Sequence, residues 1–171
     1  YRYIDDIKSI IQNDLKPTLH TNTDEVNEVL ESINNNNSCF IHYRSYEEDP
    51  GSKRYLDSYY TNAIRLMKDK FSNLKFFIFS DSAIQARTFF KSLDDNFFYV
   101  DLDISKGNYG SLIDFYLMYK CKHSIIGNSS FSWWSALLSD YGNKEIIYPY
   151  GLSPWGEDWA PQSWSKIHVS V

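Results

Sequence analysis

Hydrophobic positions along this chain follow two different spacings. Over residues 4–11, and again over residues 26–33, isoleucine, valine and leucine recur every three or four positions. This spacing is typical of amphipathic helices. Thr23 and Asp24 precede the second segment and are favourable residues for capping a helix. We therefore predict that residues 1–37 form a helical lead-in.

From residue 38 onward, short apolar runs alternate with segments of helical spacing. The apolar runs, which we predict to be buried strands, lie at residues 39–43, 75–79, 97–100, 123–126, 145–148 and 167–169. Apolar stripes of helical spacing fall at residues 56–67, 86–93, 109–117 and 131–138. This alternation predicts an α/β fold over residues 38–171: a Rossmann-like doubly wound parallel sheet with helices on both faces.

The composition narrows the class of protein. With 171 residues, of which 43% are hydrophobic and 18% aromatic, the chain is long enough for one well-packed domain. A net charge of −5 argues against a broad nucleic-acid-binding surface. No apolar run reaches the roughly 20 residues that span a bilayer, so no transmembrane segment is expected.

Two features of the chain bear on where it works. No secretory leader is visible, and an Asn-, Lys- and Ile-rich composition favours a bacterial cytoplasmic protein. Because the sequence begins with Tyr1 rather than Met, we expect it to be a part of a longer protein, which could itself be membrane-associated.

Metal chemistry finds little support in the sequence. Cys39 and Cys121 lie on predicted apolar strands, where buried free thiols are expected rather than a disulfide or a metal site. The four histidines are scattered, which argues against a structural zinc. Asp101 and Asp103 form a D-x-D triplet that can hold a metal–diphosphate, but such triplets are also frequent after strands. No metal cofactor is therefore expected.

Polar side chains follow two strands that should be neighbours. In an open α/β sheet, ligands bind beyond the carboxyl ends of the strands where the strand order reverses, which in a doubly wound order lies between the first and fourth strands. The first strand ends in His42 and Arg44, and the fourth leads to Asn128, Ser129 and Ser130 at the start of a predicted helix. A guanidinium facing a helix N-terminus with two hydroxyls is the outline of a phosphate clamp.

Each of these residues also has an ordinary structural explanation. Arg44 alone could be a solvated surface residue, and Ser129 and Ser130 alone are most often helix caps. Ser80 and Asp81, after the second strand, are interpreted as a cap first and as ligand contacts second. No Gly-rich dinucleotide or nucleoside-triphosphate fingerprint occurs. The coincidence of polar groups at one predicted crevice is what favours a phosphate ligand.

The most specific segment of the chain is CKHSIIGNSSFSWWSALL at 121–138, and three further segments stand in order around it. Together they resemble motifs of the α-1,2-fucosyltransferases of glycosyltransferase family 11. HYRSYEE at 42–48 is similar to that family's His-x-Arg-Arg-Gly-Asp motif. FIFSDS at 77–82 is similar to its strand ending in Ser-Asp, and DWAPQSWSKI at 158–167 to its Asp-x-x-Pro-x-x-Trp element. The resemblance covers most of the chain.

The resemblance implies the GDP-fucose-binding half of a two-domain GT-B enzyme, which transfers fucose with inversion to a glycan hydroxyl in α-1,2 linkage and works without a metal. Arg44 would hold the donor diphosphate and be the catalytic residue. His42 and Asp114 would contact the nucleoside, with the carboxylate reading guanine N–H groups. The full set of implied donor-binding residues is His42, Arg44, Ser80, Asp81, Asp114, Asn128, Ser129, Ser130 and Phe131.

The chain also departs from the family pattern. Ser45 stands where the family has a second Arg, and Tyr46-Glu47 stand where it has Gly-Asp. The acidic residues 47–49 fit a solvated loop better than a catalytic base. No segment corresponds to the acceptor-binding N-terminal half, so the fragment alone is expected to bind donor and not to turn over efficiently.

Two other functions stay open at the level of sequence. Trp155, Trp159 and Trp164 cluster near the C-terminus and could stack on sugars in a lectin-like module, although packing against the domain is the simpler explanation. A magnesium-dependent α/β phosphohydrolase would use Asp101 or Asp103 as its nucleophile. A lectin would bind sugar regardless of GDP, and a phosphohydrolase would require the metal.

Overall fold

The fold was analysed in a computed structural model, which describes residues 4–19, 23–45, 50–93, 97–102, 110–139, 141–151 and 159–169. The strands are β1 (Asn37–Tyr43), β2 (Leu74–Ser80), β3 (Phe97–Tyr99), β4 (His123–Ile125), β5 (Ile146–Tyr150) and β6 (Ser165–His168). Across the described ranges they form one sheet in the order β3-β2-β1-β4-β5-β6, and every neighbouring pair is parallel. The predicted doubly wound α/β fold is therefore confirmed.

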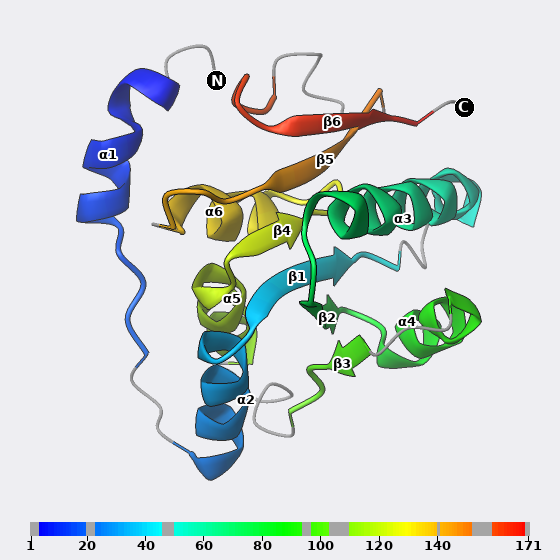
Figure 1. The fold of residues 1–171 in the computed structure, drawn as a ribbon, viewed down its shortest axis with the longest axis horizontal. Helices are drawn as coiled ribbons and strands as arrows, with labels where there is room; N and C mark the ends of the chain where they lie inside the picture. Colours follow the sequence, from blue (N-terminus) through cyan, green and yellow to red (C-terminus); the bar gives the residue numbers. More distant parts are fainter. Residues whose placement is uncertain are drawn as a thin grey trace.

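Helices cover both faces of the sheet (Figure 1). They are α1 (Ile4–Asp14), α2 (Asp24–Asn34), α3 (Pro50–Lys70), α4 (Ala83–Phe90), which continues into the 3₁₀ turn η1 (Lys91–Leu93), α5 (Gly110–Lys120) and α6 (Ser130–Leu138). Helices α2, α5 and α6 share a core cluster on one face, whereas α3 and α4 share a cluster on the other. Helix α1 lies outside this layer, against α6.

The strand and helix types match the sequence prediction, and the differences lie at the ends of elements. Helix α3 begins at Pro50 rather than near residue 56, because proline at the first helical position has a favourable φ and lacks an N–H that the helix would leave unpaired. Thr23 caps α2 as expected, since its side chain accepts a hydrogen bond from Val26 N–H at 3.4 Å.

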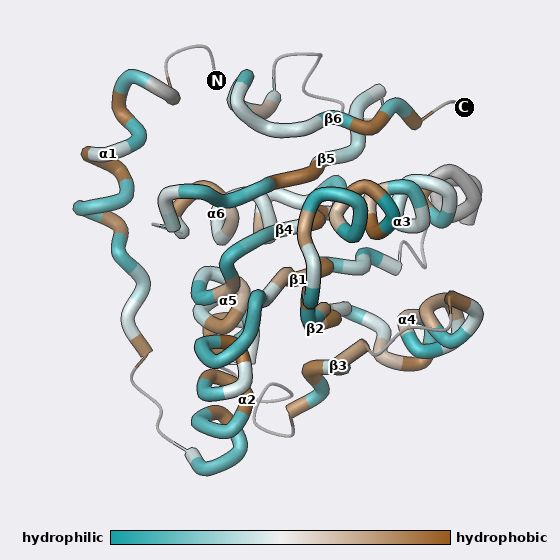
Figure 2. Tube along the Cα trace, viewed as in Figure 1, coloured by the Kyte–Doolittle hydropathy of each residue, from teal (hydrophilic) through white to brown (hydrophobic). Residues whose placement is uncertain are grey.

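The central strands are buried on both faces. Phe40 of β1 belongs to the cluster under α2, α5 and α6, and its neighbour Ile41 belongs to the cluster under α3 and α4. Hydrophobic positions concentrate on the inner strands, as Figure 2 shows for β1 and β5, while hydrophilic positions dominate α2. Cys39 and Cys121 are buried free thiols, as predicted. None of the helices in the described ranges combines the length and apolarity that crossing a bilayer requires.

Helix α2 is part of the core of the sheet domain. Its Val26, Val29 and Ile33 are buried in the same cluster as Phe40 and Phe77 of the sheet. Because α2 immediately precedes β1, its packing places the start of the first strand in the middle of the sheet.

Candidate functional site

Strands β1 and β4 separate at the carboxyl edge of the sheet. Their register runs as far as Ile41 opposite Ile125, while β1 continues beside β2 to Tyr43. After β4 the chain turns at Gly127, whose carbonyl accepts a hydrogen bond from Ser129 N–H at 2.8 Å. Because β1 and β4 are neighbours with strand order reversing between them, this is the switch point predicted from the sequence.

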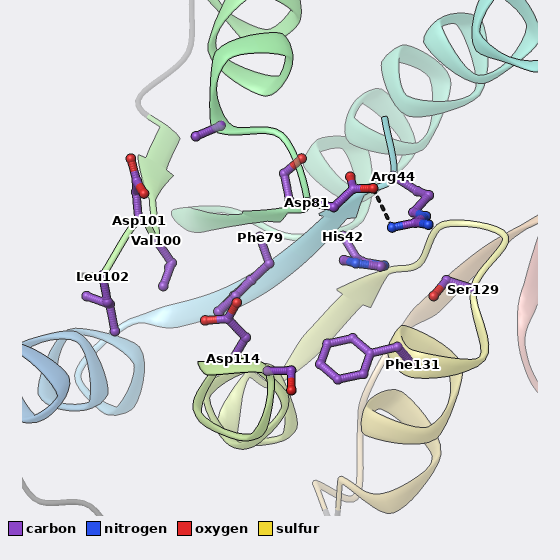
Figure 3. Close-up of a pocket in the computed structure, with 13 residues that line it drawn as sticks. His42, Arg44, Phe79, Asp81, Val100, Asp101, Leu102, Asp114, Ser129 and Phe131 are labelled. Carbon is purple, nitrogen blue, oxygen red and sulfur yellow. Dashed lines mark hydrogen bonds and ion pairs between the residues drawn. The ribbon is translucent and has the colours of Figure 1, made fainter. Parts of the chain in front are cut away.

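A cavity of about 520 Å³ lies at this edge of the sheet. His42 and Arg44 border it from the end of β1, Ser129 and Phe131 from the start of α6, and Asp114 from α5 (Figure 3). The other residues that line it are Phe79, Ser80, Asp81, Ala83, Val100, Asp101, Leu102 and Ser111. This volume falls within the range of small-molecule sites, roughly 300–1,000 Å³.

The guanidinium of Arg44 is oriented by Asp81. One carboxylate oxygen, Oδ2, accepts a hydrogen bond from Arg44 Nη1, and the other, Oδ1, accepts from the backbone N–H of Ser45 at 2.8 Å. The Arg44 side chain is still 47% exposed, so the ion pair itself adds little to stability. The ion pair instead fixes the orientation of the guanidinium. A guanidinium has five N–H donors, so one that is held by Asp81 still has donors left for a phosphate.

His42 is a neutral, buried imidazole beside the cavity. Only 7% of it is exposed, and its Nδ1 has no hydrogen-bond partner within the described part of the chain. Burial lowers the pKa of His42 to about 4; Asp81 opposes this shift and Arg44 adds to it. The ring packs against Phe131, with the ring centroids 5.8 Å apart. A neutral imidazole in this position can donate or accept one hydrogen bond with a ligand.

The start of α6 faces the cavity with a hydroxyl and with backbone N–H groups that the helix itself does not pair. Ser129 holds the N-cap position, but its side chain makes no capping hydrogen bond, and it lines the cavity. The first backbone N–H groups of a helix have no partner within the helix, and the helix dipole makes this end positive. The hydroxyl and the N–H groups are therefore available to an anion, and the plain-cap explanation does not account for Ser129.

The residues on either side of Ser129 are placed differently. Ser130 is exposed and borders a separate apolar hollow with Phe115 and Trp134. Asn128 is half-buried and does not line the cavity. Of the three polar residues predicted at this junction, Ser129 is the one whose side chain reaches the cavity.

Ser80 and Asp81 both line the cavity, and each also makes hydrogen bonds within the fold. The Ser80 hydroxyl accepts a hydrogen bond from Ser82 N–H at 3.0 Å and so shapes the turn before α4. Ser82 is the N-cap residue of α4. Asp81 lies across the cavity rim from α6 and holds Arg44 (Figure 3).

The structure also describes Ser45 and Asp101, two positions at which the sequence departed from the family pattern or suggested a metal site. Ser45 is buried and does not line the cavity. Asp101 lines the cavity, and its carboxylate lies 3.7 Å from the Arg87 guanidinium. In the portions that the structure describes, no three His, Cys, Asp or Glu side chains are grouped as a metal site would need. Asp103 and the acidic residues 47–49 lie outside the described residues.

The C-terminal tryptophans belong to the core. Trp159 and Trp164 are buried, and each packs against Tyr148 with ring centroids 5.3 and 6.4 Å apart. Trp164 also packs against Trp133 of α6. Trp155 lies outside the described residues. Packing, rather than a sugar-stacking surface, therefore explains Trp159 and Trp164.

Sequence reasoning missed the apolar wall of the cavity. Phe79 is the next-to-last residue of β2, and Val100 and Leu102 follow β3. Their position at the carboxyl ends of strands is the signal that could have found them, because all these ends meet at one edge. Ser111 could have been found from Asp114, since residues three apart share one side of a helix.

An open parallel sheet with an Arg-bearing cavity at its switch point defines a Rossmann-like domain of the kind that binds phosphorylated ligands. Residues 54–152, more than half of the chain, match the model of Glycosyl transferase family 11. The chain therefore belongs to this family, which confirms the resemblance found in the sequence.

Two curated relatives from Escherichia coli support the assignment. An α-1,2-colitosyltransferase is 35% identical over an alignment of 122 positions, and the match covers 65% of this chain and 39% of the relative. The O-antigen biosynthesis glycosyltransferase WbnK is 33% identical over an alignment of 121 positions, and the match covers 67% of this chain and 39% of the relative. The chain thus matches about two fifths of the length of these relatives.

Solved structures of the fucosyltransferase NodZ share the fold. A crystal of this α-1,6-fucosyltransferase soaked with GDP-fucose matches 67% of this chain and 40% of NodZ, with a TM-score of 0.53 and 23% identity. A second NodZ structure, from Bradyrhizobium, matches 77% of this chain and 44% of NodZ, with a TM-score of 0.57 and 23% identity. At this identity the likeness bears on the fold alone.

Proposed function

We propose that the cavity binds a GDP-sugar, GDP-fucose in the first instance, and that this chain is the donor-binding half of a GT-B glycosyltransferase. The observation that carries the proposal is the pairing of two phosphate-binding elements at the switch point. Arg44 is anchored by Asp81, and the uncapped start of α6 borders the same cavity. A diphosphate between them would meet a positive charge and a helix N-terminus.

The rest of the cavity suits a nucleoside. Asp114 projects from α5 into the same space as His42 and Phe131 (Figure 3). A carboxylate at this end can accept hydrogen bonds from the N1–H and the amino group of guanine, which adenine and uracil cannot offer in the same pattern. Phe79, Val100 and Leu102 supply an apolar wall against which a base or ribose can pack.

The proposed reaction needs stabilisation of a departing nucleoside diphosphate. An acceptor hydroxyl attacks the anomeric carbon of fucose from the face opposite the leaving group and loses its proton to a base or to water. The C–O bond to the β-phosphate breaks, GDP leaves, and the configuration inverts. Arg44 and the α6 N-terminus would stabilise the negative charge that develops on GDP, and Arg44 is thereby our candidate catalytic residue. Stabilisation of this charge by Arg44 and the helix requires no metal, and we propose that the transfer is metal-independent.

The acceptor and linkage are proposed from the relatives. Because the chain matches about two fifths of their length, we place the glycan acceptor site in the part of the enzyme that this chain does not match. The name of the colitosyltransferase relative specifies an α-1,2 linkage, and we propose the same linkage for fucose here, in a cytoplasmic enzyme.

A nucleotide panel tests the proposal. We expect GDP at about 100 times its dissociation constant to stabilise the chain by about 3 kcal/mol, which raises the melting temperature by roughly 5–10 °C. UDP and ADP at the same concentration should have much smaller effects, and Asp114→Asn should reduce the preference for GDP. Neither magnesium nor EDTA should alter the result. Equal shifts with all three nucleotides, or a magnesium requirement, would contradict the proposal.

A further inference from the structure

The hydroxyl of Tyr60 occupies the point at which β1 and β4 separate. It donates a hydrogen bond to the carbonyl of His42 at 2.8 Å and accepts one from the backbone N–H of Arg44 at 3.3 Å. Tyr60 is fully buried on α3, in the core cluster on one face of the sheet. Helices α5 and α6, which line the cavity, belong to the other face. One hydroxyl therefore holds the backbone of His42, within β1, and of Arg44, which directly follows the strand; both residues border the cavity.

These two hydrogen bonds have the pattern of a parallel ladder. In a parallel sheet, one residue donates to a carbonyl of the neighbouring strand and accepts from the N–H two residues further along that strand. Extending the register from Ile41 opposite Ile125 by two residues would set Gly127 opposite Tyr43. Gly127 would then bond the carbonyl of His42 and the N–H of Arg44.

Gly127 has instead left the ladder. Its carbonyl accepts a hydrogen bond from Ser129 N–H in the turn that leads to α6. The Tyr60 hydroxyl makes both ladder bonds in its place. It fits because residue 127 has no side chain: a Cβ there would lie 3.0 Å from both Tyr60 Oη and the His42 carbonyl oxygen.

We infer that Tyr60 is a positioning residue for the phosphate-binding site. By replacing the hydrogen bonds that β4 no longer supplies, it keeps β1 extended through Arg44 while the strands part to open the cavity. Without it, the buried carbonyl of His42 and the partly buried N–H of Arg44 lose a partner, and the backbone that carries Arg44 has to move to find one. The inference rests on the proposed function, because the ligand that would report on Arg44 is a nucleoside diphosphate.

The test compares binding of GDP and GMP by calorimetry in wild-type and Tyr60→Phe chains. Because Arg44 is proposed to hold the diphosphate, we expect Tyr60→Phe to weaken GDP binding about tenfold. GMP binding should weaken less, so that the preference for GDP over GMP falls at least threefold. A purely structural role would leave this preference unchanged.

Tyr43→Phe is the matched control. Tyr43 lies in the same aromatic cluster, with its ring centroid 5.2 Å from that of Tyr60. Its buried hydroxyl has no hydrogen-bond partner in the described part of the chain, so both affinities should stay as in the wild type. Gly127→Ala keeps the Tyr60 side chain but crowds its hydroxyl and the His42 carbonyl oxygen, and it should also lower the preference for GDP.

Each outcome is decisive. An unchanged GDP-over-GMP preference in folded Tyr60→Phe would overturn the positioning role. If Tyr60→Phe does not fold, Gly127→Ala provides the same decision by the same ratio. Binding of GDP by the wild type together with an unchanged ratio would leave the proposed function standing and remove the inference. Absence of GDP binding by the wild type would overturn both.

Discussion

His42 lies near the end of β1, Arg44 directly follows its last residue, and both border the cavity. The two side chains differ in their exposure to solvent. His42 is enclosed by Phe131 and the core, and burial lowers its pKa to about 4. Arg44 lies at the rim, where Asp81 orients it and solvent still reaches it. The site thus combines a neutral hydrogen-bonding group with an oriented cation.

The lowered pKa of His42 predicts a specific dependence of stability on pH. In the unfolded chain the imidazole titrates near its ordinary pKa of about 6.5, so between about pH 6.5 and 4 the unfolded state binds more protons. The free energy of unfolding should therefore fall as the pH is lowered through this window. Urea denaturation at pH 7 and pH 5 should show a contribution of about 2 kcal/mol from His42.

His42→Gln provides the comparison for this prediction. His123 has a lowered pKa as well, mainly through burial, but it is present in both chains and cancels in the difference. The variant should lose less stability than the wild type between pH 7 and pH 5. Equal losses in the two chains would show that His42 is not held neutral in the folded state.

Two cases, the Ser129–Ser130 pair and Tyr60, show why the sequence predicted the site only in part. The sequence placed Ser129 and Ser130 together, but Ser129 is the N-cap residue with extended backbone and Ser130 is the first residue of α6, so their side chains leave the backbone in different directions. Ser129 therefore lines the cavity while Ser130 borders another hollow. The hydrophobic pattern identified Tyr60 only as a core residue of α3. Its role depends on hydrogen bonds from its hydroxyl to backbone atoms of His42 and Arg44, which a sequence pattern does not reveal.

Helix α6 has a distinct task at each end. Its N-terminus borders the cavity with Ser129 uncapped, whereas its C-terminus is closed by a side chain from the following turn. Lys144 Nζ donates to the carbonyl of Ala136 at 2.9 Å and to the carbonyl of Ser139. A cation at this end complements the helix dipole and satisfies carbonyls that the helix leaves unpaired.

Removing this closure should destabilise the fold without affecting the ligand site. We expect Lys144→Met to lower the free energy of unfolding by about 1–3 kcal/mol, measured by urea denaturation. GDP affinity should not change, because Lys144 lies at the end of α6 away from the cavity. Lys91→Met, at an exposed position, should change stability by less than about 0.5 kcal/mol. Similar losses for both lysines would contradict a capping role.

At the scale of the whole molecule, the helices on the two faces of the sheet contribute to the site in different ways. Helices α5 and α6 supply the cavity wall on one face, and α3 supports the strand ends from the other. The order of strands and helices followed from the sequence because buried parallel strands are continuous apolar runs. The sequence did not reveal how firmly α2 belongs to this domain, because an amphipathic stripe does not identify the surface it covers.

The contribution of α2 can be measured with one substitution. Ile33 is 0% exposed in the core cluster, so Ile33→Ala should lower the free energy of unfolding by about 2–5 kcal/mol. Ile10→Ala on α1 is the control, because Ile10 is 59% exposed and its loss should be within about 0.5 kcal/mol. Equal and small losses would mean that α2 is not an integral part of the domain.

Calorimetric titration with GDP, of the wild type and of Arg44→Ala, tests the central claim most directly. We expect the wild type to bind one GDP per chain and Arg44→Ala to bind about 10- to 150-fold more weakly, since the charged hydrogen bonds lost are worth about 1.5–3 kcal/mol. Arg65→Ala, at an exposed position on α3, should bind GDP as the wild type does. No measurable binding by the wild type, or equal binding by Arg44→Ala, would contradict the account.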